Sequence, residues 1–191
     1  MVSVDDALRQ VGNATSLPEL AAIARSVPCV PATPNVLLYS GVSGEALSAA
    51  RSATGYSVID DTARADLLSD ARFRAAVGRA CGLAGSVEEV GALVKQARNL
   101  PADDPDKAAA MAANAAMFGV EGDAAALQNS FWGQASSEFV EAATGDVVVM
   151  MPKPLQKVFW ASELPTMLDK PGARTINGIP AKELAADKNS A

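Results

Sequence analysis

The segment from residue 35 to 60 constrains the fold of this chain most, because its pattern is strand, helix, strand. Residues 35–40 have the length and apolar character of a short buried strand, and residues 56–60 have those of a second strand. Between the two, Ser43 and Gly55 are placed as the N-cap and the C-terminal stop of a helix. This order is typical of the start of an α/β layer.

Most of the remaining chain carries apolar residues at helical spacing. Such patterns run from residue 4 to 27 and from 63 to 117, and Ser16 is the predicted N-cap of the second helix. One more helix is expected from about Ala124 to Ala143. Three later segments are predicted strands: 145–152, 157–164 and 174–179.

The chain has no internal repeat and no linker-like segment that would divide it into independent domains. We therefore predict one α/β (α+β) domain, residues 1–191, with two lobes. The mainly helical lobe comprises residues 1–35 and 63–143, and it packs on a small, mostly parallel sheet flanked by helices. The sheet comes from residues 36–62 and 145–180. The polar tail that follows is expected to fray.

The charge balance argues against nucleic acid as a partner. The chain has 16 basic and 22 acidic residues, a net charge of −6, and no basic cluster to lie along a phosphate backbone.

The apolar runs of the chain are shorter than the roughly 18 residues of a membrane span, so we predict no span. Residues 1–13 carry acids where a signal peptide needs basic residues. We therefore expect no signal peptide in this chain and a protein that acts in a cytosol.

The absence of histidine limits the chemistry. With no His and only two Cys, the chain cannot form a Ser-His-Asp triad, a Cys-His dyad or the usual zinc sites. Catalysis would rest on carboxylates, hydroxyls, aromatic rings and backbone groups. Cys29 lies in an apolar segment and Cys81 in a helical pattern, so we expect free, buried thiols, with one disulfide between them as the alternative.

Three acidic side chains are candidates for a site. Asp60 and Asp61 end the second predicted strand, so one could face a pocket while the other caps the next helix. Capping and surface exposure are the commoner outcome for such a pair. Glu163 follows Phe159 in an apolar setting, and buried carboxylates usually have a partner or a task. A strand at 157–164 would alternate sides, however, and from the residues alone we expect Glu163 to face water.

Two further features have both an ordinary and a functional interpretation. The turn at Ser40 and Gly41 joins a strand to a helix, where backbone N–H groups and the helix dipole favour a phosphate. The same turn is also a common connection. Trp132 and Ser136 lie one turn apart on one face of the predicted helix, and Phe139 continues the stripe. Residues in such a row on one helix face usually pack in the core.

Taken in order, these features resemble the ADP-ribosyl cyclase and NAD glycohydrolase family. One stretch matches a stretch of that family without gaps, and its matching positions are Phe131, Trp132, Ser136, Phe139, Ala142, Ala143 and the strand that begins at Asp146. The resemblance covers roughly residues 36–70 and 129–168.

The other matching positions lie at turns. Tyr39 and Ser40 stand where the family has a Trp-Ser turn, and residues 59–62 stand where it has Leu-Glu-Asp-Thr. Glu163, four residues after Phe159, stands at the family's catalytic glutamate. These are the positions to which the family's functional residues can be carried over.

The resemblance implies an ADP-ribosyl cyclase-like fold and an enzyme that cleaves the nicotinamide–ribose bond of NAD or NADP. The products would be nicotinamide with ADP-ribose, cyclic ADP-ribose or both, and no cofactor or metal would be required. Glu163 would hold ribose hydroxyls and stabilise positive charge at the anomeric carbon. Trp132 would stack on a substrate ring, and Asp60 would accept from the carboxamide. The implied substrate-binding residues are Tyr39, Ser40, Gly41, Asp61, Ser136 and Phe159.

The chain departs from the family at several positions. Tyr39 is smaller than the family's Trp, Asp60 is one methylene shorter than its Glu, and Ser69 stands where a second acid is expected, with Asp70 next to it. The disulfide framework of the animal members is missing, which suits a microbial relative that folds in, or is delivered into, a reducing compartment. Such a domain could be an NAD-depleting toxin or effector with a neutralising immunity protein as partner.

Three alternatives stay open. A non-catalytic relative would bind NAD or its fragments without turnover. A helical interaction module would use Trp132 only as core. A mono-ADP-ribosyltransferase would use the same bond, but Ala161 and Ser162 precede Glu163 where that class has a Glu-x-Glu or Gln-x-Glu pair.

Overall fold

The computed structural model describes residues 2–39, 42–150, 159–170 and 174–188. The chain forms two compact units. The helical unit comprises Met1–Pro28 and Ala63–Gln134, and the sheet unit comprises Cys29–Thr62 and Ala135–Ala191. The fold is of mixed α/β class, as the sequence predicts, with the strands confined to one unit. None of the described helices is both long and apolar enough to cross a membrane.

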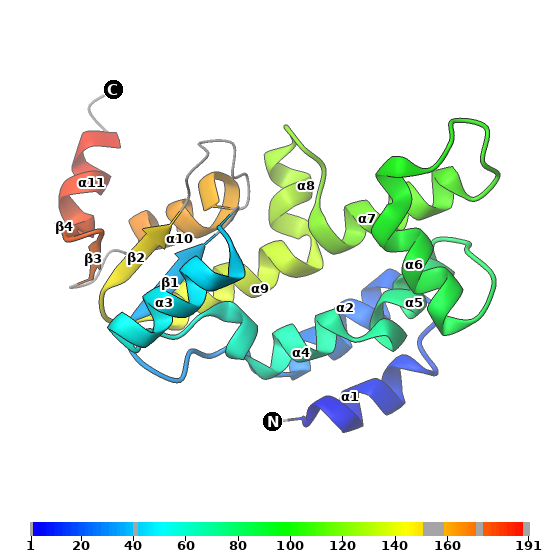
Figure 1. The fold of residues 1–191 in the computed structure, drawn as a ribbon, viewed down its shortest axis with the longest axis horizontal. Helices are drawn as coiled ribbons and strands as arrows, with labels where there is room; N and C mark the ends of the chain where they lie inside the picture. The colour runs from blue at the N-terminus through cyan, green and yellow to red at the C-terminus, as the bar shows by residue number, and fades with distance from the viewer. Residues whose placement is uncertain (1, 40–41, 151–158, 171–173, 189–191) are drawn as a thin grey trace. The chain divides into compact units, whose positions relative to one another are not determined.

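Helices make up the helical unit (Figure 1). They are α1 (Val4–Val11), α2 (Leu17–Ser26), α4 (Ala63–Ser69), α5 (Ala71–Ala80), α6 (Val87–Gln96), the 3-10 turn η2 (Ala97–Asn99), α7 (Lys107–Phe118), α8 (Ala124–Asn129) and the start of α9 (Phe131–Ala142). Polar side chains cap several of these helices. Ser16 caps α2 as predicted, in a reciprocal arrangement with Glu19.

Close packing in the helical unit depends on small residues and aromatic pairs. A Cβ atom added at Gly78 of α5 would lie 2.4 Å from Val90 Cγ1 of α6, so this position lets the two helices approach. Phe73 of α5 and Phe131 of α9 meet edge to face, with ring centroids 5.1 Å apart. Phe73 is fully buried. These contacts define the core of this unit.

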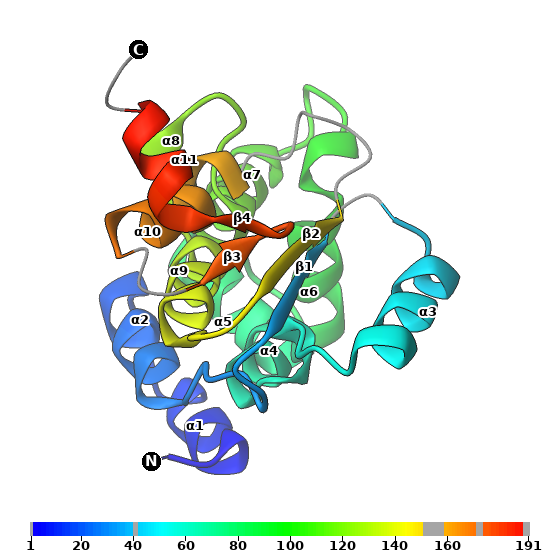
Figure 2. The same ribbon diagram turned by 90° about the vertical axis from the view of Figure 1, so that its left-hand side faces the viewer.

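Among its described residues, the sheet unit has four strands in the order β1-β2-β3-β4 (Figure 2). They are β1 (Val36–Tyr39), β2 (Val147–Met150), β3 (Thr175–Ile176) and β4 (Ile179–Pro180). The β1–β2 and β2–β3 pairs are parallel and the β3–β4 pair is antiparallel, so the sheet is mostly parallel, as predicted. The other elements of the unit are α3 (Gly44–Thr54), η1 (Ile59–Asp61), the rest of α9, η3 (Phe159–Glu163), α10 (Leu164–Asp169) and α11 (Ala181–Lys188).

Side chains of asparagine and arginine hold the strand ends and α9 in place. The Asn35 carboxamide accepts a hydrogen bond from the backbone N–H of Asp146 (2.8 Å), just before β2. The Arg174 guanidinium, which is buried, donates to the carbonyl of Val140 in the last turn of α9 (2.8 Å). A cation there satisfies a carbonyl that the helix leaves unpaired. Both contacts therefore fix the α9–β2 connection.

Two of the predicted strands have different structures. Residues 56–60 contribute one parallel bridge, between Val36 and Ser57, and then form the 3-10 turn η1. Residues 159–164 form the π-helical turn η3 and the start of α10, so the strand prediction for this segment was wrong over its described part. Short apolar runs fit a buried helix as well as a strand, and the alternation rule cannot separate the two.

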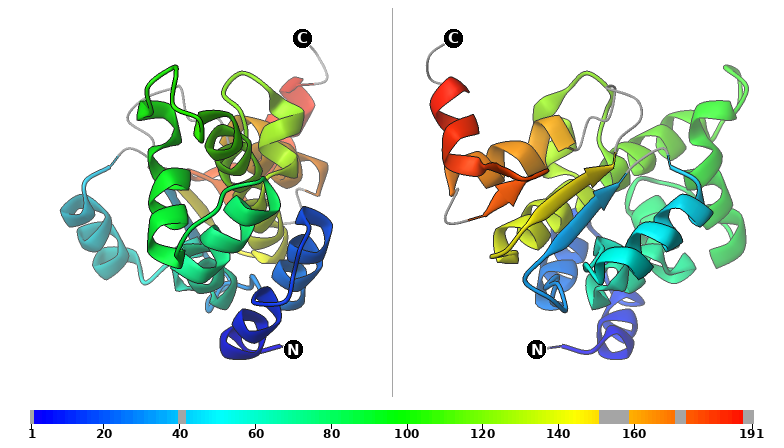
Figure 3. Two further views of the ribbon diagram at one scale, coloured as in Figure 1. Left: turned by 90° about the vertical axis from the view of Figure 1, so that its right-hand side faces the viewer. Right: turned by 60° about the vertical axis from the view of Figure 1, so that its left-hand side comes forward.

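The C-terminal segments are also more regular than expected. Residues 175–180 hold two short strands joined by a turn at Asn177 and Gly178, whose φ angles are +49° and +81°. Residues 181–188 of the tail expected to fray form α11 directly after β4 (Figure 3).

The long helix predicted from Ala124 to Ala143 is interrupted at Ser130. The Ser130 hydroxyl donates to the Leu127 carbonyl (2.8 Å) and accepts from the Gly133 N–H (3.0 Å), which ends α8 and caps α9. Gly133 also permits a close approach, because a Cβ atom there would lie 1.8 Å from the Leu127 carbonyl oxygen.

Gly133→Ala should therefore destabilise the protein by about 2 kcal/mol or more, because the added methyl group would overlap a backbone atom. Gly44→Ala is the matched control, since nothing lies within 4 Å of a Cβ atom at that position. Urea denaturation should place the Gly44 variant within about 0.5 kcal/mol of the wild type. Equal stability of the two variants would contradict this packing.

Candidate active site

Glu163 is a buried carboxyl group at the end of the π-helical turn η3. Its side chain is only 7% exposed, so the expectation that a strand would leave it in water was wrong. Burial raises the pKa of Glu163 to about 7, and a hydrogen bond from Ser136 partly opposes that rise. A carboxyl group that titrates near neutral pH is suited to proton transfer or to charge stabilisation.

Ser136 lies on α9 and is 6% exposed. Its hydroxyl forms a hydrogen bond with the Glu163 carboxyl group. The two side chains come from segments separated by β2 in the chain, and the sheet unit brings them together. A hydroxyl donor stabilises the ionised form of a buried carboxyl group, which otherwise has no water to solvate it.

Ser162, beside Glu163, is a polar residue that the sequence interpretation did not select. It is 1% exposed, and its Oγ atom has no hydrogen-bond partner among the residues that the structure describes. Buried hydroxyl groups rarely stay without a partner, and such a group is often a functional one. In the sequence, the position of Ser162 next to a lone glutamate in an apolar run could have indicated that it belongs to the site.

Tyr39 and Asp60 form a second polar pair in the sheet unit. The Tyr39 hydroxyl donates to the Asp60 carboxylate. Burial, followed by that hydrogen bond, raises the pKa of Tyr39 well above its ordinary value, so the phenol keeps its proton. Asp61 pairs with Arg51 of α3 instead, at 2.6 Å between Oδ1 and Nη2. The two neighbouring aspartates thus have different partners.

A chain of contacts connects these two polar pairs. The Cys29 sulfur lies 3.6 Å from Thr62 Oγ1 and 3.3 Å from the carbonyl oxygen of Ala135. Thr62 follows Asp61 directly, and Ala135 precedes Ser136. The end of the turn that carries Asp60 and Asp61 is therefore held against the turn of α9 that carries Ser136. Cys29 and Cys81 are not joined in a disulfide bond, and Cys29 is buried while Cys81 is half-buried.

The predicted site residues that remain are Phe159, Trp132 and the turn at Ser40 and Gly41. Phe159 is buried and meets Trp160 edge to face at 5.2 Å. Trp132 is half-buried in the first turn of α9, within the helical unit, one turn before Ser136. Ser40 and Gly41, the predicted phosphate-binding turn, lie outside the described residues.

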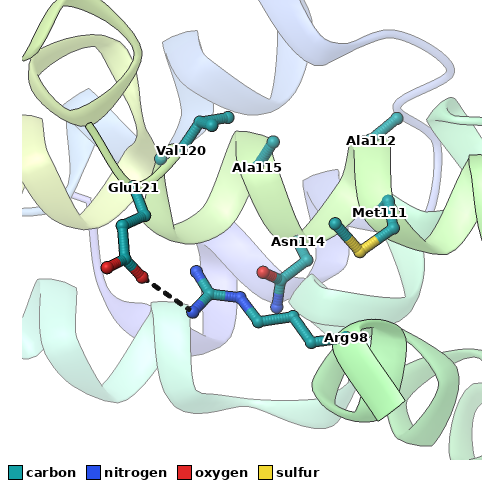
Figure 4. Close-up of a pocket in the computed structure, with 8 residues that line it drawn as sticks. Arg98, Met111, Ala112, Asn114, Ala115, Val120 and Glu121 are labelled. Carbon is teal, nitrogen blue, oxygen red and sulfur yellow. Dashed lines mark ion pairs between the residues drawn. The ribbon is translucent and has the colours of Figure 1, made fainter. Parts of the chain in front are cut away.

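Each unit contains a cavity. In the sheet unit, a cavity of about 580 Å³ is lined by residues of η3, α10, the β3–β4 hairpin and α11, including Phe159 and Trp160. In the helical unit, a cavity of about 470 Å³ lies along α7. Arg98 and Glu121 reach toward each other across it, with their charged atoms 4.0 Å apart (Figure 4). The π-helical turn η3, which ends at Glu163, also supplies Phe159 and Trp160 to the wall of the first of these cavities.

Over the described part of the chain, no group of three or more His, Cys, Asp or Glu side chains is placed to hold a metal ion. The chemistry that the described residues offer consists of one buried carboxyl group, the hydroxyls around it and the Tyr39–Asp60 pair. Comparison of the chain with models of protein families, with curated proteins and with solved structures gives no match.

The burial of Glu163 predicts a specific pH dependence of stability. The carboxyl group titrates near 4.5 when unfolded and near 7 when folded, so the folded state binds its proton more tightly. The free energy of unfolding should therefore fall as pH rises from about 4.5 to above 7. Glu163→Gln has no carboxyl group to ionise, so its free energy of unfolding should not fall in this way. The difference in free energy of unfolding between this variant and the wild type should therefore change by about 3 kcal/mol in favour of the variant between pH 4 and pH 8.

Urea denaturation at both pH values measures this difference. Glu183→Gln, at an exposed glutamate of α11, is the matched control and should follow the wild type. A Glu163→Gln profile parallel to that of the control would show that the carboxyl group is not buried in solution.

Proposed function

We propose that this protein cleaves the nicotinamide–ribose bond of NAD or a close relative of NAD, as an NAD glycohydrolase or ADP-ribosyl cyclase. The observation that carries the proposal is the buried Glu163 carboxyl group with its raised pKa and its Ser136 hydrogen bond. The motif resemblance independently selects the same glutamate and the same serine. An isolated carboxyl group of this kind suits a reaction in which positive charge develops on a sugar carbon.

The reaction needs little proton transfer to start. The bond between the anomeric carbon and the nicotinamide nitrogen breaks, and its electron pair neutralises the positive charge of the leaving ring. The sugar is left with an oxocarbenium-like positive charge. Ionised Glu163 stabilises that charge in a site shielded from water, where electrostatic interactions are strong. No histidine or other strong general acid is required.

The second step determines the product. Attack by water on the anomeric carbon gives ADP-ribose, and the water loses a proton that Glu163 can accept, since its pKa lies near 7. Attack by a nitrogen of the adenine ring in the same substrate gives cyclic ADP-ribose instead. The extent to which adenine can reach the charged carbon before water does therefore controls the ratio of the two products.

The Tyr39–Asp60 pair would hold the nicotinamide group. The Asp60 carboxylate can accept a second hydrogen bond, from the substrate carboxamide, while Tyr39 keeps it oriented. In the resemblance, Tyr39 takes the place of a tryptophan, and its ring can still stack on a flat ligand.

An enzyme that consumes NAD in this way would deplete the NAD of a cell in which it is active. This supports a role as an effector with a neutralising partner.

Incubation of NAD with the protein should release nicotinamide together with ADP-ribose or cyclic ADP-ribose, as resolved by chromatography. Glu163→Gln should lower kcat by about 10³-fold, because it removes the charge but keeps the shape. Glu183→Gln is the matched control and should retain activity. Unchanged NAD at high concentrations of folded protein would overturn the proposal, and binding without turnover would favour the non-catalytic alternative.

The pH profile provides a further prediction. Because Glu163 must be ionised to stabilise the charge, kcat should rise with pH through about 7. Ser136→Ala removes a hydrogen bond that lowers the pKa of Glu163, so the rise should move to higher pH. Ser137→Ala, at the next residue, should leave the midpoint in place. A midpoint that is the same in the wild type and the Ser136 variant would contradict the role of the Ser136 hydrogen bond in setting the pKa of the titrating group.

A further inference from the structure

The cavity in the sheet unit, which we call the Trp160 cavity, does not include Glu163, Ser136, Tyr39 or Asp60 among the described residues that line it. Its volume of about 580 Å³ lies within the range of small-molecule sites. Its walls come from η3, α10, the β3–β4 hairpin and α11, all within the sheet unit. Phe159, one of the substrate-binding residues that the resemblance implies, lines it. The four groups to which the proposed chemistry gives a role do not, so the cavity is separate from them.

The cavity and Glu163 share the π-helical turn η3, which begins at Phe159 and ends at Glu163. Phe159 and Leu164 both line the cavity, whereas Glu163 is directed to Ser136. The turn thus presents an apolar face on one side and a carboxyl group on the other.

Aromatic side chains dominate one wall of the cavity. Trp160 is 56% exposed, although a large apolar side chain usually gains by burial. It meets Phe159 edge to face, at 5.2 Å between ring centroids and 75° between ring planes. An exposed indole ring held by a second aromatic ring is a surface on which a flat ligand can stack.

Asn177, in the turn between β3 and β4, supplies a polar group to the lining. Its carbonyl oxygen accepts from the N–H of Val149 in β2 (2.8 Å), which orients the carboxamide. Its amide nitrogen can then donate to a ligand. None of the described residues that line the cavity carries a charge. An uncharged ring with a hydrogen-bond acceptor at its edge matches this lining.

From these features we infer that the Trp160 cavity binds a flat, uncharged heteroaromatic ring of the nucleobase class. The ring stacks on Trp160, and an acceptor atom at its edge receives a hydrogen bond from the Asn177 amide. Aliphatic side chains such as Ile179 and Leu184 complete the enclosure. The inference does not rest on the proposed NAD cleavage, because the cavity residues and the Glu163 group are distinct.

Adenosine is the first probe, since it has a flat base and no nicotinamide bond to cleave. In ¹⁵N-labelled protein the two tryptophans give two indole N–H signals, and Trp160→Phe assigns the signal of Trp160. Millimolar adenosine should shift that signal in a saturable way. The same titration in Glu163→Gln should give an unchanged Kd, so that failure of binding and failure of catalysis are distinguishable.

Two variants locate the ligand. Trp160→Ala should weaken adenosine binding at least about tenfold through the loss of stacking. Asn177→Asp keeps the acceptor for Val149 but removes the donor, and it should weaken binding as well. Nicotinamide, titrated in parallel, shows which kind of base the cavity prefers, and a shift of the Trp160 signal by either base supports the inference.

Three results would overturn the inference. The first is a shift of the Trp160 signal by cyclohexanol at the same concentration as adenosine, which would mean a cavity for any apolar group. The second is a signal that both bases leave unchanged in folded protein. The third is a shift of the signal on dilution together with a change in sedimentation, which would mean that Trp160 contacts a second copy of the chain.

Discussion

The hydrogen bond between Ser136 and Glu163 is the interaction on which the candidate site depends. A carboxyl group that is almost fully buried loses its hydration, and this loss raises its pKa to about 7. The Ser136 hydroxyl replaces part of that hydration. It can do so only because α9 presents it toward the turn that carries Glu163, so the packing of the sheet unit and the acidity of Glu163 are coupled.

Several contacts of the sheet unit support this arrangement. Arg174 holds the last turn of α9, and Cys29 lies between Thr62 and the backbone beside Ser136. Tyr39, the last residue of β1, donates a hydrogen bond to Asp60. In open parallel sheets, ligand sites form beyond the carboxyl ends of the strands. The Tyr39–Asp60 pair stands at such an end.

Local signals in the sequence predicted many elements correctly. The strands β1 and β2 were found because they are short runs of branched apolar residues, and α3 because Ser43 and Gly55 mark its ends. Ser16 was found as a cap for the same reason. The strand prediction for residues 157–164 failed over its described part, 159–164, because a buried helical turn and a buried strand have the same composition. The break at Ser130 was missed because one hydroxyl forms two backbone hydrogen bonds there.

The candidate site shows the same division between local and tertiary information. The sequence by itself determined the available chemistry: no histidine, a lone glutamate after a phenylalanine, and a serine on a helical stripe. It could not determine that Glu163 is buried, that Ser136 reaches it, or that Ser162 is enclosed beside it. Those outcomes depend on a π-helical turn and on contacts between segments far apart in the chain. Burial and pKa are properties of the packed environment, and only the tertiary structure decided them.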